Sequence, residues 1–239
     1  MKILSIETSS EVCSVAVLED RKVLKELNLE NGNTHSQNLM PLISQILDET
    51  QLNLNEIDLF ACDNGPGSFT GIRIGIATIK AFRDVTLKPV IGISSLNALI
   101  YNLKNINADI ICSIIDAKND NVYCGIFTYN NQILRKLENY RFENITSILE
   151  YFKTEKFLNK SIFFVGNGSI VYKDVIQFKL GKRVLFSKET ENKLNATSVA
   201  YAAFDEFKNN SNFSEIVPLY LKKSSAEITL EEKTNGIVN

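Results

Sequence analysis

Histidine is almost absent from this sequence: His35 is the only one among 239 residues. A metal site built on two histidines is therefore excluded. The four cysteines, Cys13, Cys62, Cys112 and Cys124, show no Cys-x-x-Cys spacing that could replace it. A single histidine also favours no particular Ser-His-Asp or Cys-His arrangement. Glu7, Asp63, Asp116 and Asp120 at or near predicted strand ends could hold a magnesium ion, but a role as turn and cap residues is favoured. We therefore expect no catalytic residues and no metal ligands in this chain, and we expect the cysteines to be reduced and buried.

Long apolar runs and a strong charge of one sign are missing as well. The apolar runs are a few residues long, against the roughly 20 that a membrane span needs. The N-terminal segment 1–8, which contains Glu7, meets a charge too early to be a signal peptide. The net charge of −2 argues against strong direct binding of nucleic acid, since such binding depends on clustered Lys and Arg. We expect a cytoplasmic protein without membrane contact.

The order of predicted elements indicates an α/β fold of two related lobes. The first lobe is predicted to hold strands at 2–7, 13–18 and 22–29, a helix at 34–50, a strand at 57–62, a helix at 71–84, a strand at 89–92 and a helix at 95–103. A similar order follows, with strands at 109–116, 123–129 and 132–137, a helix at 146–152, a strand at 161–165 and a helix at 198–208. The predicted domains are residues 1–103 and 104–239, the second with a polar tail after Leu230.

The glycine-rich segment 64–71 allows two interpretations. As a phosphate cradle, it would direct glycine amides and a helix N-terminus at an anion. Its glycines miss the Gly-x-Gly-x-x-Gly spacing by one residue, and no Gly-Lys-Ser/Thr follows. A tight strand-to-helix turn, capped by Ser68 or Thr70, is therefore favoured. If a phosphate or nucleotide does bind, the residues expected nearby are Glu7, Gly65, Gly67, Ser68, Gly166 and Gly168.

The two helices of the first lobe are more apolar than surface helices usually are. In the helix at 71–84, isoleucines surround the axis, and Gly71 and Gly75 would let another helix approach closely. The helix at 34–50 has a wide apolar arc. We expect a partner to cover part of these helices, with burial inside the chain as the alternative.

Several segments together resemble the TsaB (YeaZ) family. They are Ile-Glu-Thr-Ser-Ser at 6–10, Ser-Val-Ala-Val at 14–17, Thr-His-Ser at 34–36, Gly-Pro-Gly-Ser-Phe-Thr-Gly-Ile-Arg-Ile-Gly at 65–75, Ile-Ser-Ser-Leu at 93–96, Asp-Ala-Lys at 116–118 with Val-Tyr at 122–123, and Pro-Leu-Tyr-Leu-Lys at 218–222 with Ala-Glu at 226–227. The resemblance is strong over residues 1 to about 125 and thinner beyond.

This resemblance implies a two-lobed actin/Hsp70/sugar-kinase-like (ASKHA, ribonuclease H-like) fold, with βββαβα repeated. It also implies a role in the threonylcarbamoyl modification of adenosine 37 in tRNAs that read codons starting with A. In that family the paralogue TsaD transfers the group, TsaB pairs with TsaD, and the small ATPase TsaE joins them. TsaD carries a His-x-x-x-His metal pair where this sequence has Ser95 and Leu99, and leucine cannot ligate a metal. The resemblance therefore implies a non-catalytic scaffold or activator subunit.

The partner surface carried over by position lies on the two helices of the first lobe. Its residues are His35, Leu39, Met40, Ile43, Leu47, Gly71, Ile72, Arg73, Gly75, Ile76, Ile79 and Arg83. We expect TsaD and TsaE as partners, a homodimer through the same helices when TsaD is missing, and contact with tRNA only through the complex. No cofactor is expected to bind stably, and ATP or ADP at the interface of the full complex stays open. The alternative function is a stand-alone ATPase or phosphotransferase that uses the cleft between the lobes.

Overall fold

The computed structural model describes residues 1–30, 34–103, 106–131, 133–209 and 215–222. Its first sheet has the strand order β3-β2-β1-β4-β5. The strands β1 (Lys2–Glu7), β2 (Cys13–Glu19) and β3 (Lys22–Leu29) are antiparallel neighbours, while β4 (Leu59–Gly65) and β5 (Val90–Ser94) continue the sheet in parallel beyond β1. The central strands β1 and β4 are buried along most of their length, which explains their nearly continuous apolar sequence.

The second sheet repeats this arrangement. Its strands are β6 (Ile110–Asp116), β7 (Asn121–Asn130), β8 (Ile133–Lys136), β9 (Arg141–Asn144), β10 (Ile162–Val165) and β11 (Val184–Phe186). From β8 to β11 the order is β8-β7-β6-β10-β11, with β9 also paired to β7. Antiparallel neighbours lie on one side of β6 and parallel neighbours on the other, as around β1. The predicted repeat of one strand–helix order in two lobes is confirmed.

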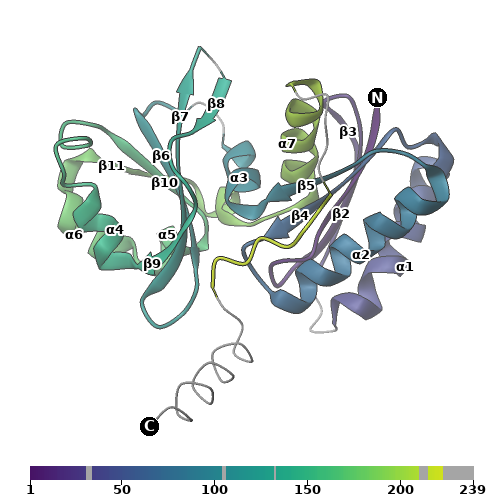
Figure 1. Ribbon diagram of the computed structural model, residues 1–239, viewed down its shortest axis with the longest axis horizontal. Coiled ribbons are helices and arrows are strands. Elements are labelled where there is room, and N and C mark those ends of the chain that lie inside the picture. The colour runs from purple at the N-terminus through teal and green to yellow at the C-terminus, as the bar shows by residue number, and fades with distance from the viewer. Residues whose placement is uncertain (31–33, 104–105, 132, 210–214, 223–239) are drawn as a thin grey trace, which may run out of the picture.

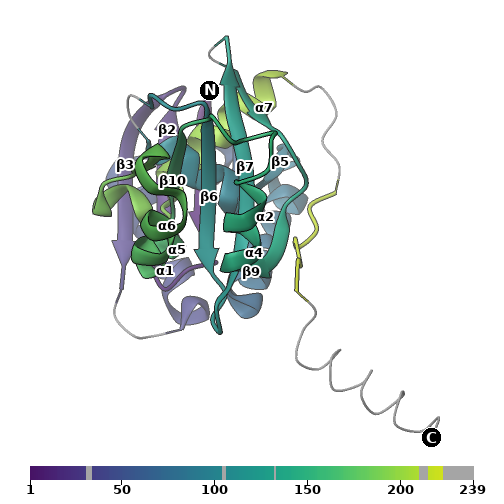
Figure 2. The same ribbon diagram turned by 90° about the vertical axis from the view of Figure 1, so that its left-hand side faces the viewer.

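Helices and sheets alternate in five layers (Figure 1). The helices α1 (His35–Thr50) and α2 (Phe69–Thr86) cover the outer face of the first sheet. Between the sheets lie α3 (Ser95–Ala98) and α7 (Ala196–Asn209). The outer face of the second sheet carries α4 (Ile145–Tyr151), α5 (Asn167–Val171) and α6 (Lys173–Leu180), which face the viewer in Figure 2. Three apolar clusters fill the spaces between these layers.

The helix α7 follows the second sheet in the sequence but packs against the first. Its alanines, including Ala200 and Ala203, are fully buried and let the helix lie close to the strands. The hydroxyl of Ser5 donates to the carbonyl oxygen of Ala196 over 2.7 Å, and Ser14 Oγ accepts the N–H of Ala196 over 2.9 Å. The predicted boundary between residues 103 and 104 lies between the two sheets, yet a segment beyond it completes the first sheet's core.

Differences from the expected elements are confined to short segments. The helix predicted at 95–103 is α3 followed by the 3-10 turn η2 (Leu99–Asn102). The strands β9 and β11, the helices α5 and α6, and the turns η1 (Leu54–Glu56), η3 (Gly181–Arg183) and η4 (Glu189–Asn192) were not predicted. Most are too short to show a period in the sequence. Residue 132 of a predicted strand and the tail after Leu230 lie outside the described residues.

Residues 215–222 return to the first sheet and run along α2. Within this segment Ile216 is buried, and the N–H of Leu219 donates to the carbonyl oxygen of Asn64 over 2.8 Å. The ring of Tyr220 stacks on Phe69 at 4.6 Å between centroids, and its hydroxyl accepts the Nε–H of Arg73 over 2.7 Å. This segment therefore covers the flank of α2 that faces away from α1.

The start of α2 allows a direct test of this packing. A Cβ at Gly71 would lie 1.8 Å from the carbonyl oxygen of Thr8, so Gly71→Ala must push the helix off the loop after β1. We expect a loss of about 1–3 kcal/mol or more in the free energy of unfolding, measured by urea titration. The adjacent exposed substitution Thr70→Ala is the control and should change stability little. Equal stability of both variants would contradict the close approach.

Candidate functional site

The loop after β1 is wrapped around a buried carboxyl group. Glu7 is the last residue of β1 and is fully buried. Its Oε1 accepts hydrogen bonds from the N–H of Ser9 (2.8 Å), the N–H of Ser10 (2.9 Å) and the hydroxyl of Ser9 (3.0 Å). The hydroxyl of Ser10 donates to Oε2 over 2.8 Å. Both oxygens of Glu7 are therefore bonded within the chain.

A second buried carboxyl group, Asp63 of β4, lies in the same place. It accepts the N–H of Thr8 over 3.1 Å and the hydroxyl of Ser95 over 3.3 Å, and Ser95 in turn contacts the hydroxyl of Ser9 over 3.1 Å. Burial raises the pKa of Glu7 to about 8, and the neighbouring charge of Asp63 is the second cause. Burial also raises the pKa of Asp63. At neutral pH the raised pKa of Glu7 favours its protonated form, which avoids two adjacent buried charges.

The glycine-rich loop 64–71 packs directly on this β1 loop. The N–H of Ser68 donates to the carbonyl oxygen of Ser9 over 2.8 Å, and Ser68 Oγ accepts the N–H of Gly71 over 3.2 Å. Of the two predicted caps, Ser68 is the one that caps α2. A Cβ at Gly67 would lie 2.5 Å from the carbonyl oxygen of Ser9. Glycine is needed here because two backbones touch, and the amides of Ser68 and Gly71 point at protein oxygens.

The corresponding turn of the second lobe is organised around an amide. Gly166 has φ +102° and donates its N–H to Asn192 Oδ1 over 2.7 Å. The same oxygen accepts the hydroxyls of Ser187 (2.6 Å) and Ser169 (3.1 Å). A Cβ at Gly168 would lie 3.1 Å from the carbonyl oxygen of Ile114. The predicted phosphate-vicinity residues thus form two groups: Glu7, Gly65, Gly67 and Ser68 in the first lobe, and Gly166 and Gly168 in the second.

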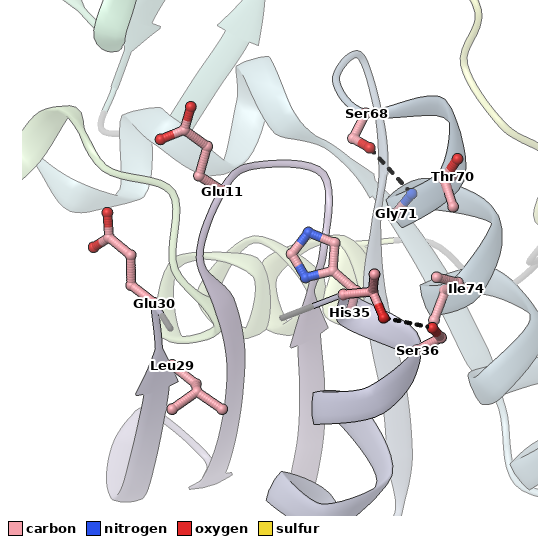
Figure 3. A pocket seen from close by; sticks show the side chains of 10 residues that line it. Glu11, Leu29, Glu30, His35, Ser36, Ser68, Thr70, Gly71 and Ile74 are labelled. Carbon is pink, nitrogen blue, oxygen red and sulfur yellow. Dashed lines mark hydrogen bonds between the residues drawn. The ribbon is translucent and has the colours of Figure 1, made fainter. Parts of the chain in front are cut away.

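A cavity of about 540 Å³ opens where α1 and α2 begin (Figure 3). Hydroxyl groups line one side, and Glu11 and Glu30 lie on the other. The imidazole of His35, the first residue of α1, donates from Nε2 to the carbonyl oxygen of Ser10 over 2.9 Å. Its Nδ1 is buried without a hydrogen-bond partner among the described residues. The full lining comprises Glu11, Leu29, Glu30, Thr34, His35, Ser36, Ser68, Thr70, Gly71 and Ile74.

Most of the predicted partner-surface residues face the first sheet. Those buried inside the chain are Leu39, Ile43, Gly71, Ile72, Gly75, Ile76 and Ile79. For these side chains the alternative, burial inside the chain, holds, because they pack against the outer face of the first sheet. A charge at Ile76 would disrupt the core, so it cannot serve as a probe of partner binding.

The remaining predicted residues lie on the outer sides of the helices. Met40 is 52% exposed and Leu47 is half-buried. Arg73 is exposed and bonds Tyr220, whereas Arg83 is half-buried and pairs with Asp84 over 2.8 Å.

Small and apolar residues share the outward faces of α1 and α2. On α1, Ser44 lies one helical turn from both Met40 and Leu47, and α2 presents a run at i, i+3 and i+7. We call these residues the outer seam: Met40, Ser44, Leu47, Ile74, Ala77 and Ala81. All six are exposed or half-buried. Ser44, Ile74, Ala77 and Ala81 were not among the predicted partner-surface residues.

Comparisons with known proteins identify the family. The family model TsaD, described as tRNA N6-adenosine threonylcarbamoyltransferase, matches residues 29–230. A protein of Buchnera aphidicola subsp. Schizaphis graminum, named tRNA threonylcarbamoyladenosine biosynthesis protein TsaB, is 33% identical over 70% of this chain and 78% of its own. The chain belongs to the TsaB family. The protein of the same name from Bacillus subtilis is 26% identical over 95% of this chain and 96% of its own.

Solved structures support the fold. YeaZ from Pseudomonas aeruginosa superposes with a TM-score of 0.76 at 24% identity, covering 92% of this chain and 99% of that one. A ROK hexokinase from Thermus thermophilus superposes with a TM-score of 0.51 at 9% identity, covering 88% and 100%. The predicted two-lobed actin/sugar-kinase-like fold is therefore confirmed.

The buried carboxyl pair predicts a pH dependence of stability. Because the pKa of Glu7 is raised from 4.5 to about 8 on folding, the folded TsaB-family chain holds this proton more tightly than the unfolded chain. The free energy of unfolding should then fall as pH rises between about 4.5 and 8. In Glu7→Gln this fall should be largely lost, as judged by melting temperatures from pH 5 to 8.5. The control Glu11→Gln, at an exposed position, should keep the slope of the wild type, and parallel slopes in all three would contradict the prediction.

Proposed function

We propose that this chain is the non-catalytic subunit of a tRNA threonylcarbamoyladenosine biosynthesis complex, and that it binds a TsaD-type partner through the outer seam. Membership of the TsaB family gives the pathway. The proposed mode of action, binding of a partner, is inferred from the outer seam. Two long helices, each fixed to the sheet by its buried side, present small side chains outward, and small side chains let a partner helix approach closely.

The hydrogen bonds of the buried Glu7 and Asp63 carboxyl groups support a structural role for the ends of β1 and β4. Glu7 and Asp63 accept hydrogen bonds from the loop that surrounds them, so donors of the chain occupy the oxygens that a metal would need. At the two positions where TsaD carries its histidines, Ser95 bonds Asp63 and Leu99 is 1% exposed in the core. We propose that catalysis belongs to the partner.

The other parts of the assembly are proposals of the same kind. We propose a TsaE-type ATPase as a further partner, and a homodimer through the outer seam when the TsaD-type partner is missing, since a self-complementary helix pair favours isologous contacts. An ATP or ADP in the full complex would have room in the cavity beside His35.

No described helix is both long and apolar enough to cross a membrane. We propose the cytoplasm as the location.

The alternative, a stand-alone ATPase or phosphotransferase, is not favoured. Its phosphate-binding amides would come from the turns at Ser68 and Gly166, and those N–H groups bond Ser9 and Asn192 instead. ATP hydrolysis by the purified chain without any partner is the result that would revive it.

The outer seam is tested by Ala77→Arg. Ala77 is exposed in the middle of α2, and arginine is a good helix former, so the variant should fold. A bulky charge in the centre of a helix–helix contact should weaken binding of the TsaD-type partner by about 30-fold or more, corresponding to a hot spot of ~2 kcal/mol. Calorimetric titration of one purified subunit with the other measures this.

A matched variant controls for the added charge. Ser147 is a small exposed residue in α4, on the far side of the molecule, and Ser147→Arg should bind the partner as the wild type does. If Ala77→Arg retains wild-type affinity while remaining folded, the outer seam is not the partner surface.

A further inference from the structure

Basic residues are concentrated in one stretch of the second lobe. Residues 153–183 hold seven of the 26 Lys and Arg of the chain but only two of its 28 Asp and Glu. This stretch therefore carries +5, although the whole chain carries −2. It includes α5 and α6, which lie with α4 on the outer face of the second sheet (Figure 2), and the turn η3, which follows α6 in the chain. We call this surface the basic face; its cations are Lys153, Lys156, Lys160, Lys173, Lys179, Lys182 and Arg183.

One arginine joins the two segments of the basic face. Arg183 donates from Nη1 to the carbonyl oxygens of Phe157 (2.5 Å) and Leu158 (2.9 Å), and from Nη2 to that of Phe152 (3.1 Å). The turn η3 is therefore fixed against the loop after α4. Nη1 of Arg183 also donates to the carbonyl oxygen of Lys160 over 3.4 Å, so the turn that holds Lys182 packs against the backbone at Lys160.

Acidic residues neutralise only part of this surface. Glu150 Oε1 accepts both Lys153 (2.9 Å) and Lys179 (3.0 Å), so two cations meet one carboxylate. Lys156 pairs with Glu138. Glu155 and Asp174 are also exposed on these segments. Lys160 and Lys182 are exposed and have no ion pair within 4 Å among the described residues. Hydrogen bonds from Ser161, and next the charge of Lys160, lower the pKa of the exposed Asp109, so Lys182 is the cation of the two with no acidic group identified beside it in the described part of the chain.

An aromatic ring is exposed among these cations. Phe178 of α6 is 85% exposed and is followed directly by Lys179. Leu158, on the neighbouring loop, is 52% exposed. A ring that faces water beside lysines is the combination that binds nucleic acid, because the lysines attract phosphates and the ring offers a surface on which a base can stack.

We propose that the basic face contacts the tRNA substrate directly, with Lys160 and Lys182 at backbone phosphates and Phe178 against an unpaired base. This inference rests on the proposed function, which makes tRNA the substrate of the complex. It departs from the expectation that the complex holds tRNA without direct contact from this chain. The contact orients tRNA from the lobe opposite the outer seam, so the two partners occupy different faces of the chain.

The test uses the full chain assembled with its TsaD-type partner and an unmodified tRNA transcript. In Lys160→Gln/Lys182→Gln, tRNA affinity should fall about tenfold at moderate salt. The slope of log K against log salt should become shallower by about 1.4–1.8, the value for two lost phosphate contacts. Phe178→Ala should weaken binding about fivefold or more, with the salt slope unchanged. Fluorescence anisotropy across a salt series measures both quantities.

Two further variants make the result decisive. Lys160→Arg/Lys182→Arg keeps both charges and should retain wild-type affinity. Lys22→Gln/Lys208→Gln removes two exposed lysines from β3 and α7, on the first sheet, and should also retain it. Unchanged tRNA affinity in the Lys160/Lys182 glutamine variant would overturn the inference.

Loss of the heterodimer in that same variant, seen by analytical ultracentrifugation, would also overturn it, because the face would then be a protein interface. Failure of the wild-type chain to bind a TsaD-type partner would instead reject the proposed function, and the two failures are therefore distinct.

Discussion

The contact between the start of α2 and the loop after β1 determines what this molecule presents to a partner. Thr8 Oγ1 donates to the carbonyl oxygen of Gly71 over 2.8 Å, and a Cβ at Gly75 would lie 2.6 Å from the same hydroxyl oxygen. Two glycines one turn apart thus let the helix touch the loop and fix its rotation about its own axis. Once that rotation is fixed, Ile72, Ile76 and Ile79 must enter the core, and Ala77 and Ala81 must face outward.

The two lobes solve one structural problem with different chemistry. In each, buried polar side chains fix the backbone beside a glycine turn that follows a strand. The first lobe uses the buried carboxyl groups of Glu7 and Asp63, which have raised pKa values and respond to pH. The second uses the amide of Asn192, which accepts comparable hydrogen bonds but carries no charge and does not titrate. The duplicated fold is therefore electrostatically asymmetric.

Much of the fold could be predicted from the sequence, while the orientation of its helices could not. The long helices and buried strands have clear periods, so their order and their repetition in two lobes were predicted correctly. An apolar arc on α1 or α2 predicts only that the arc is buried. It does not show whether a sheet of the same chain or a partner protein buries it. Ser44 and Ala77 were not among the predicted partner-surface residues, because the sequence does not show which side of each helix faces outward. The net charge of the whole chain gave no indication of the basic face, because acidic residues elsewhere in the chain offset its cations.

The position of α7 has a consequence for how the chain can be divided. This helix shields the inner side of a sheet whose strands were all completed about a hundred residues earlier in the chain. A fragment ending before the second sheet would leave Ile3, Ala61 and Ile93 without the layer that covers them in the intact molecule. Folding of the amino-terminal half is thus coupled to synthesis of nearly the entire polypeptide, and the two lobes are not interchangeable modules that evolution or an engineer could separate at the midpoint.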